Sequence, residues 1–320
     1  MQTETENRFA VDAKGEELFL IYLKNIFFTI ITIGIYYFWA KVNTQKFLFR
    51  HVSFRGQRFD YHGTGKENFI GFLKGMGIVL AGAAAVVGIY WLASMIGKFA
   101  VILVSISFYA GLLCVIPYLT IGSRRYFLSR TSFNNVRFRF TGTVTELVKI
   151  FVPGAFLSAI TLGIYSPWFV NKLDRFFTEH THLGDADFRY EGQGKELFKI
   201  YLKGILLMIP TVGIYSFWFG ANLHNYYWNR SKFQGISFRS DLKGGTLLKN
   251  AFVATGLILF TLGIGIPWAY LRSLRILIQS ISLENSPDLT AIRSVKDSGA
   301  SPLADGIQEA GEAFNSVFGG

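Results

Sequence analysis

The stretch TLGIYSPW, residues 161–168, closes a long apolar segment and has three close counterparts elsewhere in the chain. They are TIGIYYFW at 32–39, TVGIYSFW at 211–218 and TLGIGIPW at 261–268. Gly163 can end a helix in the left-handed conformation, Ser166 is a favourable helix N-cap, and Pro167 suits the first turn of a new helix. The stretch therefore predicts a helix, a corner and a second helix, built four times.

The corners belong to an internal repeat that is anchored on a phenylalanine. The anchors follow at intervals of 50, 79, 50 and 50 residues and are Phe9, Phe59, Phe138, Phe188 and Phe238. The spacing predicts a polar leader at 1–8, units at 9–58, 59–137, 138–187, 188–237 and 238–283, and a disordered tail at 284–320. The second unit is 29 residues longer and carries an additional apolar stretch. The residues assigned to the corners are Gly34, Trp39, Gly163, Ser166, Pro167, Trp168, Gly213, Trp218, Gly263, Pro267 and Trp268.

Each unit opens with a short segment in which aromatic and polar residues alternate before a glycine, which is typical of a strand that ends in a turn. The segment just upstream could pair with it as a hairpin. Thr64 with Glu67, and Thr143 with Glu146, have the spacing of helix capping boxes. We therefore interpret the glutamate that recurs in four units as a cap rather than a catalytic acid.

The composition indicates a membrane protein, because 51% of the residues are hydrophobic, 17% are aromatic and the mean hydropathy is +0.33. Apolar stretches of about twenty residues, the length that crosses a bilayer, begin near Leu18, Phe69, Phe99, Leu147, Leu197 and Leu247. The predicted fold is an all-α integral membrane protein with about six transmembrane helices from five repeats of about 50 residues. Amphipathic helices would follow the Gly-Ile-Tyr corners, and short β-hairpins would link the units.

Two arrangements remain open for the helices after the corners. They could lie in the membrane interface, or they could fold back as the second arm of a hairpin. Placing Lys172, Asp174 and Arg175 against lipid would cost about 2.5 to 3.5 kcal/mol each, which favours the interface unless the charges face a wet interior. With six spans, basic residues would lie on both sides of the membrane, so the positive-inside rule gives no clear orientation. If every unit were a hairpin, all main linkers would share the cytoplasmic side.

Basic residues near the helix starts are candidate contacts for anions or lipid head groups, because long side chains can reach the membrane surface. These candidates are Lys74, Lys149, Lys199, Lys203, Arg125 and Arg175. The net charge of +11 fits anionic lipid better than nucleic acid, since no nucleic-acid recognition module is present. We expect anionic membrane lipids as partners, and a homo-oligomer is compatible with the sequence.

Motifs of enzymes are missing from the sequence: it contains no P-loop, dinucleotide fingerprint, GxSxG or HExxH. His180 and His182, with Glu179 and Asp185 nearby, lack a convincing third metal ligand. We therefore expect no catalytic, cofactor or metal site, and no enzymatic activity.

The combination of GQGKELFKIYLKG at 192–204, TLGIYSPW and the basic aromatic run RRYF at 124–127 resembles the YjgN-like family of bacterial inner-membrane proteins. The similarity covers the five units, from Phe9 to Leu283. The resemblance implies a multi-pass inner-membrane protein and supplies no catalytic residues. The last unit departs most, with Thr246 in place of the glutamate and Gly265 in place of the tyrosine.

Two functions fit these observations. Repeated units with broken apolar segments suggest a transporter or channel-like protein for a small or anionic solute or lipid. Basic amphipathic helices held along the interface suggest instead a non-transporting scaffold that binds anionic lipids or a protein partner. Transport ranks slightly ahead, because a repeat architecture commonly encloses a space.

Overall fold

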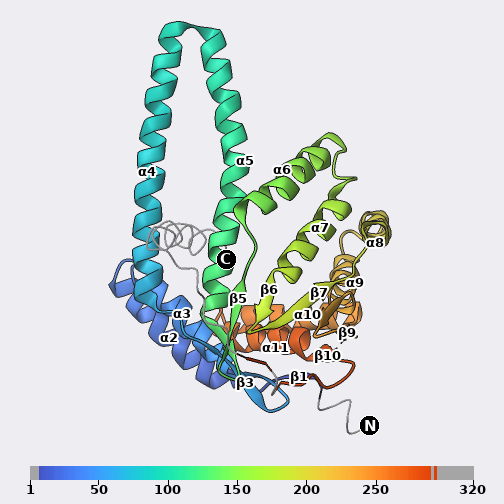
Figure 1. Ribbon diagram of the computed structural model, residues 1–320. Helices are drawn as coiled ribbons and strands as arrows, with labels where there is room; N and C mark the ends of the chain where they lie inside the picture. The colour runs from blue at the N-terminus through green and yellow to red at the C-terminus, as the bar shows by residue number, and fades with distance from the viewer. Residues whose placement is uncertain (1–6, 290–291, 294–320) are drawn as a thin grey trace.

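The computed structural model describes residues 7–289 and 292–293, and in it each unit contributes a pair of helices (Figure 1). The first helices of the pairs are α2 (Gly15–Ile31), α4 (Gly65–Ile96), α6 (Val144–Ile160), α8 (Gly194–Met208) and α10 (Gly244–Phe260). The second helices are α3 (Tyr37–Arg50), α5 (Lys98–Ser129), α7 (Ser166–Glu179), α9 (Ser216–Asn229) and α11 (Ile266–Gln279). The two helices of every pair lie against each other, so each unit is a helical hairpin.

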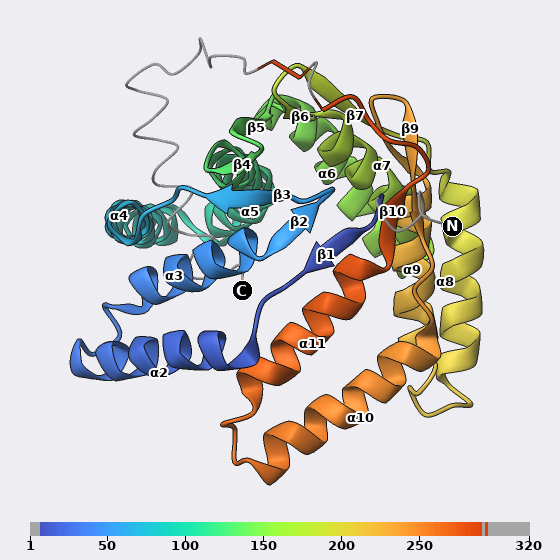
Figure 2. The ribbon, with the colours of Figure 1, turned by 90° about the horizontal axis from the view of Figure 1, so that it is seen from below.

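Short strands join the hairpins. They are β1 (Phe9–Val11), β2 (Val52–Phe54), β3 (Gln57–Tyr61), β4 (Thr131–Phe133), β5 (Val136–Phe140), β6 (Thr181–Leu183), β7 (Ala186–Tyr190), β8 (Ser231–Phe233), β9 (Ile236–Ser240) and β10 (Ile281–Leu283). All ten form one antiparallel sheet in sequence order. The sheet curves into a nearly closed ring, from which the hairpins radiate (Figure 2).

The ring is completed where β10 comes back to β1. Arg8 forms a bridge with Ser282, and the Leu283 amide donates a hydrogen bond of 2.9 Å to the Asn7 carbonyl. This bridge has the same register as the hairpins between units. In the first of these, Ser53 of β2 lies opposite Arg58 of β3, and these two residues are the repeat equivalents of Ser282 and Arg8. The helices close too, because α11 of the last unit contacts α2 and β1 of the first.

The predicted all-α fold with six transmembrane helices is wrong. The sheet of ten strands is a main element of the structure, and among the described residues only α4 and α5 are long and apolar enough to cross a membrane. The strands are three to five residues long, which is too short for a clear alternating pattern in the sequence. The remaining apolar stretches form shorter helices within the hairpins. The first of these helices, α2, has 17 residues.

Phenylalanine side chains fill the ring. The five anchor residues stack in order around it, and the ring centroids of Phe138 and Phe188 are 6.5 Å apart, as an example. The buried Phe54, Phe133 and Phe233 lie between these anchors and belong to the same core. Leu289 and Ile292, from the segment expected to be a tail, also contact this core, and most of that segment lies outside the described residues.

The corner tryptophans join neighbouring units. The indole of Trp168 lies on Gly194, the first residue of the next unit's α8, so closely that a Cβ on Gly194 would overlap it. The same contact joins Trp39 to Gly65, Trp218 to Gly244, and Trp268 to Gly15. The repeat places Tyr118 and Val144 at the equivalent positions between the second and third units. These glycines and aromatic residues therefore fit the units together around the ring.

Candidate membrane-contacting surface

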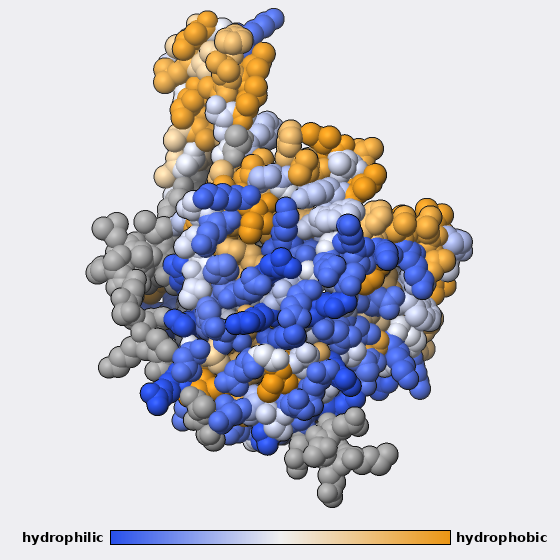
Figure 3. All heavy atoms as spheres, turned by 45° about the vertical axis from the view of Figure 1, so that its right-hand side comes forward, coloured by the Kyte–Doolittle hydropathy of each residue, from blue (hydrophilic) through white to orange (hydrophobic). Residues whose placement is uncertain are grey.

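The free ends of the short hairpins, which we call the tips, expose large apolar side chains. The most exposed residue of each tip directly precedes the corner glycine; the four are Ile33, Leu162, Val212 and Leu262, with exposed fractions of 93%, 93%, 91% and 94%. Figure 3 shows apolar atoms gathered at the ends of the helix pairs and hydrophilic atoms over the body of the molecule. The protein therefore presents apolar residues where water would disfavour them.

The same four residues have left-handed backbone conformations, with φ between 48° and 52°. The glycine after each also has a positive φ, for example 90° at Gly163. For a residue with a side chain this conformation costs roughly 1 to 2 kcal/mol, and Gly or Asn would adopt it at lower cost. Bulky apolar side chains in place of Gly or Asn indicate that these positions serve an apolar contact.

A threonine secures each corner. The Thr161 hydroxyl accepts a hydrogen bond of 3.0 Å from the Tyr165 amide and donates to the Leu157 carbonyl. Thr32, Thr211 and Thr261 act in the same way. Tyr165 occupies the N-cap position of α7, and Ser166 is the first residue of that helix. The role of this threonine was not predicted, although a threonine is the first residue of all four stretches.

Charged residues are almost absent from the hairpin ends. Across five segments the sequence contains no Asp, Glu, Lys or Arg except Lys98; the segments are 26–40, 75–123, 150–171, 204–228 and 250–271. Each segment includes the end of a first helix, the corner and the start of a second helix. Apart from Lys98, the charges of the described chain therefore lie between the hairpin ends and the ring, or on the ring itself.

A lysine marks the boundary on every first helix. The last charged residue before each of these segments is Lys24, Lys74, Lys149, Lys203 or Lys249, and all five are exposed. We call these five residues the lysine collar. Lys199 is also exposed and lies one helical turn closer to the ring than Lys203. Three of the predicted contacts, Lys74, Lys149 and Lys203, thus belong to the lysine collar, with Lys149 at the repeat position of Lys199.

The two predicted arginines lie at joints between units instead. Arg125 donates to the Gly142 carbonyl at 3.1 Å, and Arg175 donates to the Gly192 carbonyl at 3.0 Å. At the equivalent joints, Asn225 donates to Leu242 and Arg275 donates to Ala13. The structure therefore gives Arg125 and Arg175 partners in the next unit and does not bring them together with the lysines.

The repeated glutamates each face a basic residue at the end of the same unit. Two pairs are Glu67 with Arg130 at 2.7 Å and Glu196 with Arg230 at 2.8 Å, and the other two are Glu17 with His51 and Glu146 with His180. The predicted capping boxes at Thr64 and Thr143 are both present. Thr246 and Ser280 replace the pair in the last unit. Glu67 and Glu146 thus cap their helices, and all four glutamates hold the two ends of their units together.

Asp174 is the charged residue of the second helices with the most perturbed pKa. Burial raises its pKa from 3.8 to about 6, and the Arg124 guanidinium opposes this shift. Arg124 itself lies over the Phe177 ring, 5.3 Å from the ring centroid. Because the folded-state pKa is above the unfolded one, the charged carboxylate destabilises the fold above pH 6, and the penalty is relieved as pH falls through 6.

Substituting Asp174→Asn should therefore raise the free energy of unfolding at pH 7.5 by about 1 to 2 kcal/mol. The difference between variant and wild type should shrink as the pH is lowered from 7 towards 4. Thermal unfolding in detergent at pH 7.5 and at pH 5 would measure both effects. An equal difference at the two pH values would contradict the assigned origin of the shift.

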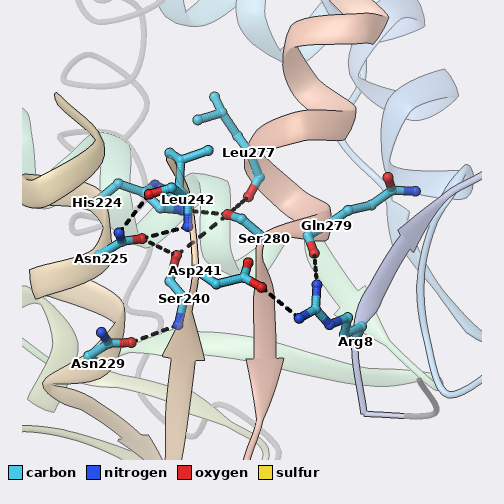
Figure 4. Close-up of polar contacts among 10 residues, drawn as sticks. All are labelled: Arg8, His224, Asn225, Asn229, Ser240, Asp241, Leu242, Leu277, Gln279 and Ser280. Carbon is cyan, nitrogen blue, oxygen red and sulfur yellow. Dashed lines mark hydrogen bonds and ion pairs between the residues drawn. The ribbon is translucent and has the colours of Figure 1, made fainter. Parts of the chain in front are cut away.

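A pocket of about 940 Å³ lies where the ring closes, lined by residues of β9, β10 and the segments next to them. Figure 4 shows the polar contacts beside it, including the ion pair of Arg8 with Asp241 at 2.7 Å. His224 Nε2 lies 3.2 Å from the Ser280 hydroxyl. The Asn225 side chain donates a hydrogen bond to the Leu242 carbonyl and accepts one from the Leu242 amide. These side chains hold the last unit to the first and to the fourth. Within the described chain, no group of His, Cys, Asp and Glu has the arrangement of a metal site.

Comparison with known proteins gives a family for most of the chain. The model of the family "Bacterial protein of unknown function (DUF898)" matches residues 6–203 and 218–310. A protein of Escherichia coli O157:H7 called "Inner membrane protein YjgN" is 31% identical over 157 residues, which are 48% of this chain and 36% of that protein. Its namesake in Escherichia coli strain K12 is 40% identical over 65 residues, 20% of this chain and 16% of that protein.

A third relative, "Inner membrane protein YjgN" of Salmonella typhimurium, is 28% identical over 127 residues, 40% of this chain and 29% of that protein. The matches thus span about a third or less of the relatives' own lengths. No solved structure matches the chain. The resemblance to the YjgN-like family is confirmed.

Proposed function

The chain belongs to the DUF898 family of bacterial proteins, and we propose that it is a non-enzymatic, non-transporting scaffold of the inner membrane that binds anionic lipids. Its curated relatives carry the name of an inner membrane protein, which supports this location. In this proposal the tips enter the bilayer and the lysine collar lies at the head groups.

The observation that carries the proposal is the apolar residue at each tip. Four side chains are more than nine-tenths exposed and also hold an unfavourable backbone conformation. Insertion into hydrocarbon would reward each such side chain by roughly 1.5 to 3 kcal/mol, which offsets the cost of the conformation. In water the same residues would only expose apolar area.

The lysine collar supports anionic lipid as the partner. Each of its lysines is exposed and stands where the charged part of a first helix gives way to a segment without charges. A basic residue near an anionic membrane surface contributes about 1 kcal/mol, and the lysine stem can lie along the apolar helix while the ammonium reaches the head groups.

The helices α4 and α5 would anchor the protein across the membrane. Each has 32 residues, and the part of α4 without charges, 75–96, is about 33 Å long at 1.5 Å per residue. This length matches a hydrocarbon core of about 30 Å. In Figure 1 this hairpin extends far beyond the others.

The filled ring supports a scaffold over a transporter. A solute that moved along the axis of the ring would have to displace the stacked phenylalanines and the buried Phe54, Phe133 and Phe233. Side chains in such a core are close-packed, so the described ring offers no ready route for a solute. The proposal therefore assigns the repeats to membrane attachment.

Replacing four of the five collar lysines by glutamine should abolish the preference for anionic lipid. The variant carries Lys24→Gln, Lys74→Gln, Lys203→Gln and Lys249→Gln. A matched control changes four exposed lysines nearer the ring in the same units, namely Lys14→Gln, Lys66→Gln, Lys195→Gln and Lys243→Gln. Electron spin resonance of spin-labelled phosphatidylglycerol and phosphatidylcholine around the reconstituted proteins would give the relative affinity of the two lipids.

We expect a preference for phosphatidylglycerol in the wild type and in the control, and none in the collar variant. An equal loss in both variants would point to total charge instead of the collar. Solute or ion flux through vesicles that contain the wild-type protein would overturn the assignment as a non-transporting protein.

A further inference from the structure

We infer that the four short hairpins enter only the cytoplasmic leaflet of the membrane, while α4 and α5 alone cross it, so that the ring lies in the cytoplasm. This inference rests on the proposed membrane attachment and adds its depth and its sidedness. The occupant of the exposed apolar tips is then the acyl region of the cytoplasmic leaflet.

The depth follows from the length of the arms without charges. In α6 this arm is 150–160 and in α10 it is 250–260, each about 16 Å long at 1.5 Å per residue. A full hydrocarbon core is about 30 Å thick, so these arms reach about its middle. The arm of α4, at 75–96, is about twice as long.

The second helices return to the side from which the first helices came. In α7 the charges resume at Lys172, and in α11 they resume at Arg272; both residues are exposed. Three of the four short hairpins thus have charged residues on both arms towards the ring and none at the tip, and in the fourth the charges resume at Arg230, directly after α9. A segment that crossed the membrane would need charged ends on both sides of the apolar region.

The backbone of the corner makes such a return compact. Two successive residues with positive φ, such as Leu162 and Gly163, reverse the chain between α6 and α7 within the five residues 161–165. The five amides of this corner donate to carbonyls of the last turn of α6 or to Thr161, as the Gly163 amide does to the Ser158 carbonyl at 2.7 Å. Backbone groups that are satisfied internally can enter hydrocarbon at low cost.

The distribution of basic residues sets the sidedness. Near the spanning pair, the ring side holds Arg50, Arg55, Arg58, Lys66, Lys74, Arg124, Arg125, Arg130, Arg137 and Arg139, whereas the far side holds Lys98 alone. Short loops rich in Lys and Arg remain in the cytoplasm. The hairpin arrangement thus removes the ambiguity that six spans would create, because all linkers lie on one side.

Single cysteines in a Cys114→Ser background test both parts in whole cells and in vesicles. The variants are Arg55→Cys on the ring, Lys98→Cys at the end of the long hairpin, and Leu162→Cys and Leu262→Cys at two short tips. Spheroplasts of a Gram-negative host are treated with a membrane-impermeant maleimide before and after permeabilisation. For depth, a fluorophore is attached to each tip cysteine in detergent, and quenching by nitroxide lipids is measured after reconstitution.

We expect labelling of Lys98→Cys from outside, labelling of Arg55→Cys only after permeabilisation, and no aqueous labelling of either short tip. The tip fluorophores should be quenched most by nitroxides near the bilayer centre. Labelling of Arg55→Cys from outside would reverse the orientation, and labelling of the short tips from outside would show that they cross. If the short tips react only from the cytoplasmic side, they are not inserted, and the proposed attachment of the tips fails as well.

Discussion

Replacing Phe233 by alanine should lower the free energy of unfolding by about 3 to 5 kcal/mol, the cost of a large cavity in a core. Phe233 is 4% exposed, and its ring centroid lies 4.7 Å from that of Phe188. It also belongs to the core that strands of all five units share. Thermal unfolding of the purified protein in detergent would measure the loss.

Phe252→Ala is the matched control, since Phe252 is 72% exposed on α10. The same substitution there should change the free energy of unfolding by less than about 0.5 kcal/mol. Comparable losses at both positions would mean that the phenylalanine core does not hold the ring together.

Substituting Gly194→Val should destabilise the protein by about 2 to 3 kcal/mol, because a side chain at this position overlaps the indole of Trp168. The chain itself suggests the compensating change. At the joint between the second and third units, Val144 and Tyr118 stand in the places of the glycine and the tryptophan. Adding Trp168→Tyr to Gly194→Val should therefore restore most of the lost stability.

A double-mutant cycle on these two positions measures the coupling as the difference between the double variant and the sum of the single ones. We expect Trp168→Tyr alone to destabilise the protein. The double variant should lose less stability than the sum of the losses of the two single variants. Additive losses would show that glycine and tryptophan do not act as a fitted pair. Gly220→Val is a control in α9, because no atom lies within 4 Å of a Cβ at Gly220.

The chemistry of the helix ends could be predicted from the sequence. The capping boxes at Thr64 and Thr143 are present as expected. These features depend on residues close together in the chain, where the physical rules of helix ends apply directly. The hairpin of strands between units was also visible, as the pairing of β4 with β5 illustrates.

The ring could not be predicted, because its closure depends on contacts between distant residues. Nothing local shows that Phe59 pairs with Phe133, or that Arg8 meets Ser282 at the other end of the chain. The number of apolar stretches also gave too many transmembrane helices, because an apolar stretch of this length can form either one crossing helix or part of a shorter helical hairpin. The charge-free segments, which include both arms and the corner, are the signal that could have separated them.

The predicted basic residues fall into two sets in the structure. The lysines at the helix starts are exposed, whereas Arg125 and Arg175 bond to backbone carbonyls of the next unit. The corner glycine drew attention, but the apolar residue before it did not. Its left-handed backbone is visible only in coordinates, since a Leu or Ile in a sequence gives no sign of a positive φ.

A ring that returns to its first unit differs from an open array of repeats, which can gain or lose a copy at either end and needs caps there. Here Trp268 of the last unit fits against Gly15 of the first, so every unit has two neighbours. Adding or removing a copy would change the curvature of the whole circle. Additional residues can be accommodated where a helical hairpin extends outwards from the ring. The second unit has 29 additional residues, which lengthen its hairpin and leave the order of the strands unchanged. The length of each hairpin can thus change during evolution far more easily than the number of repeat units in the ring.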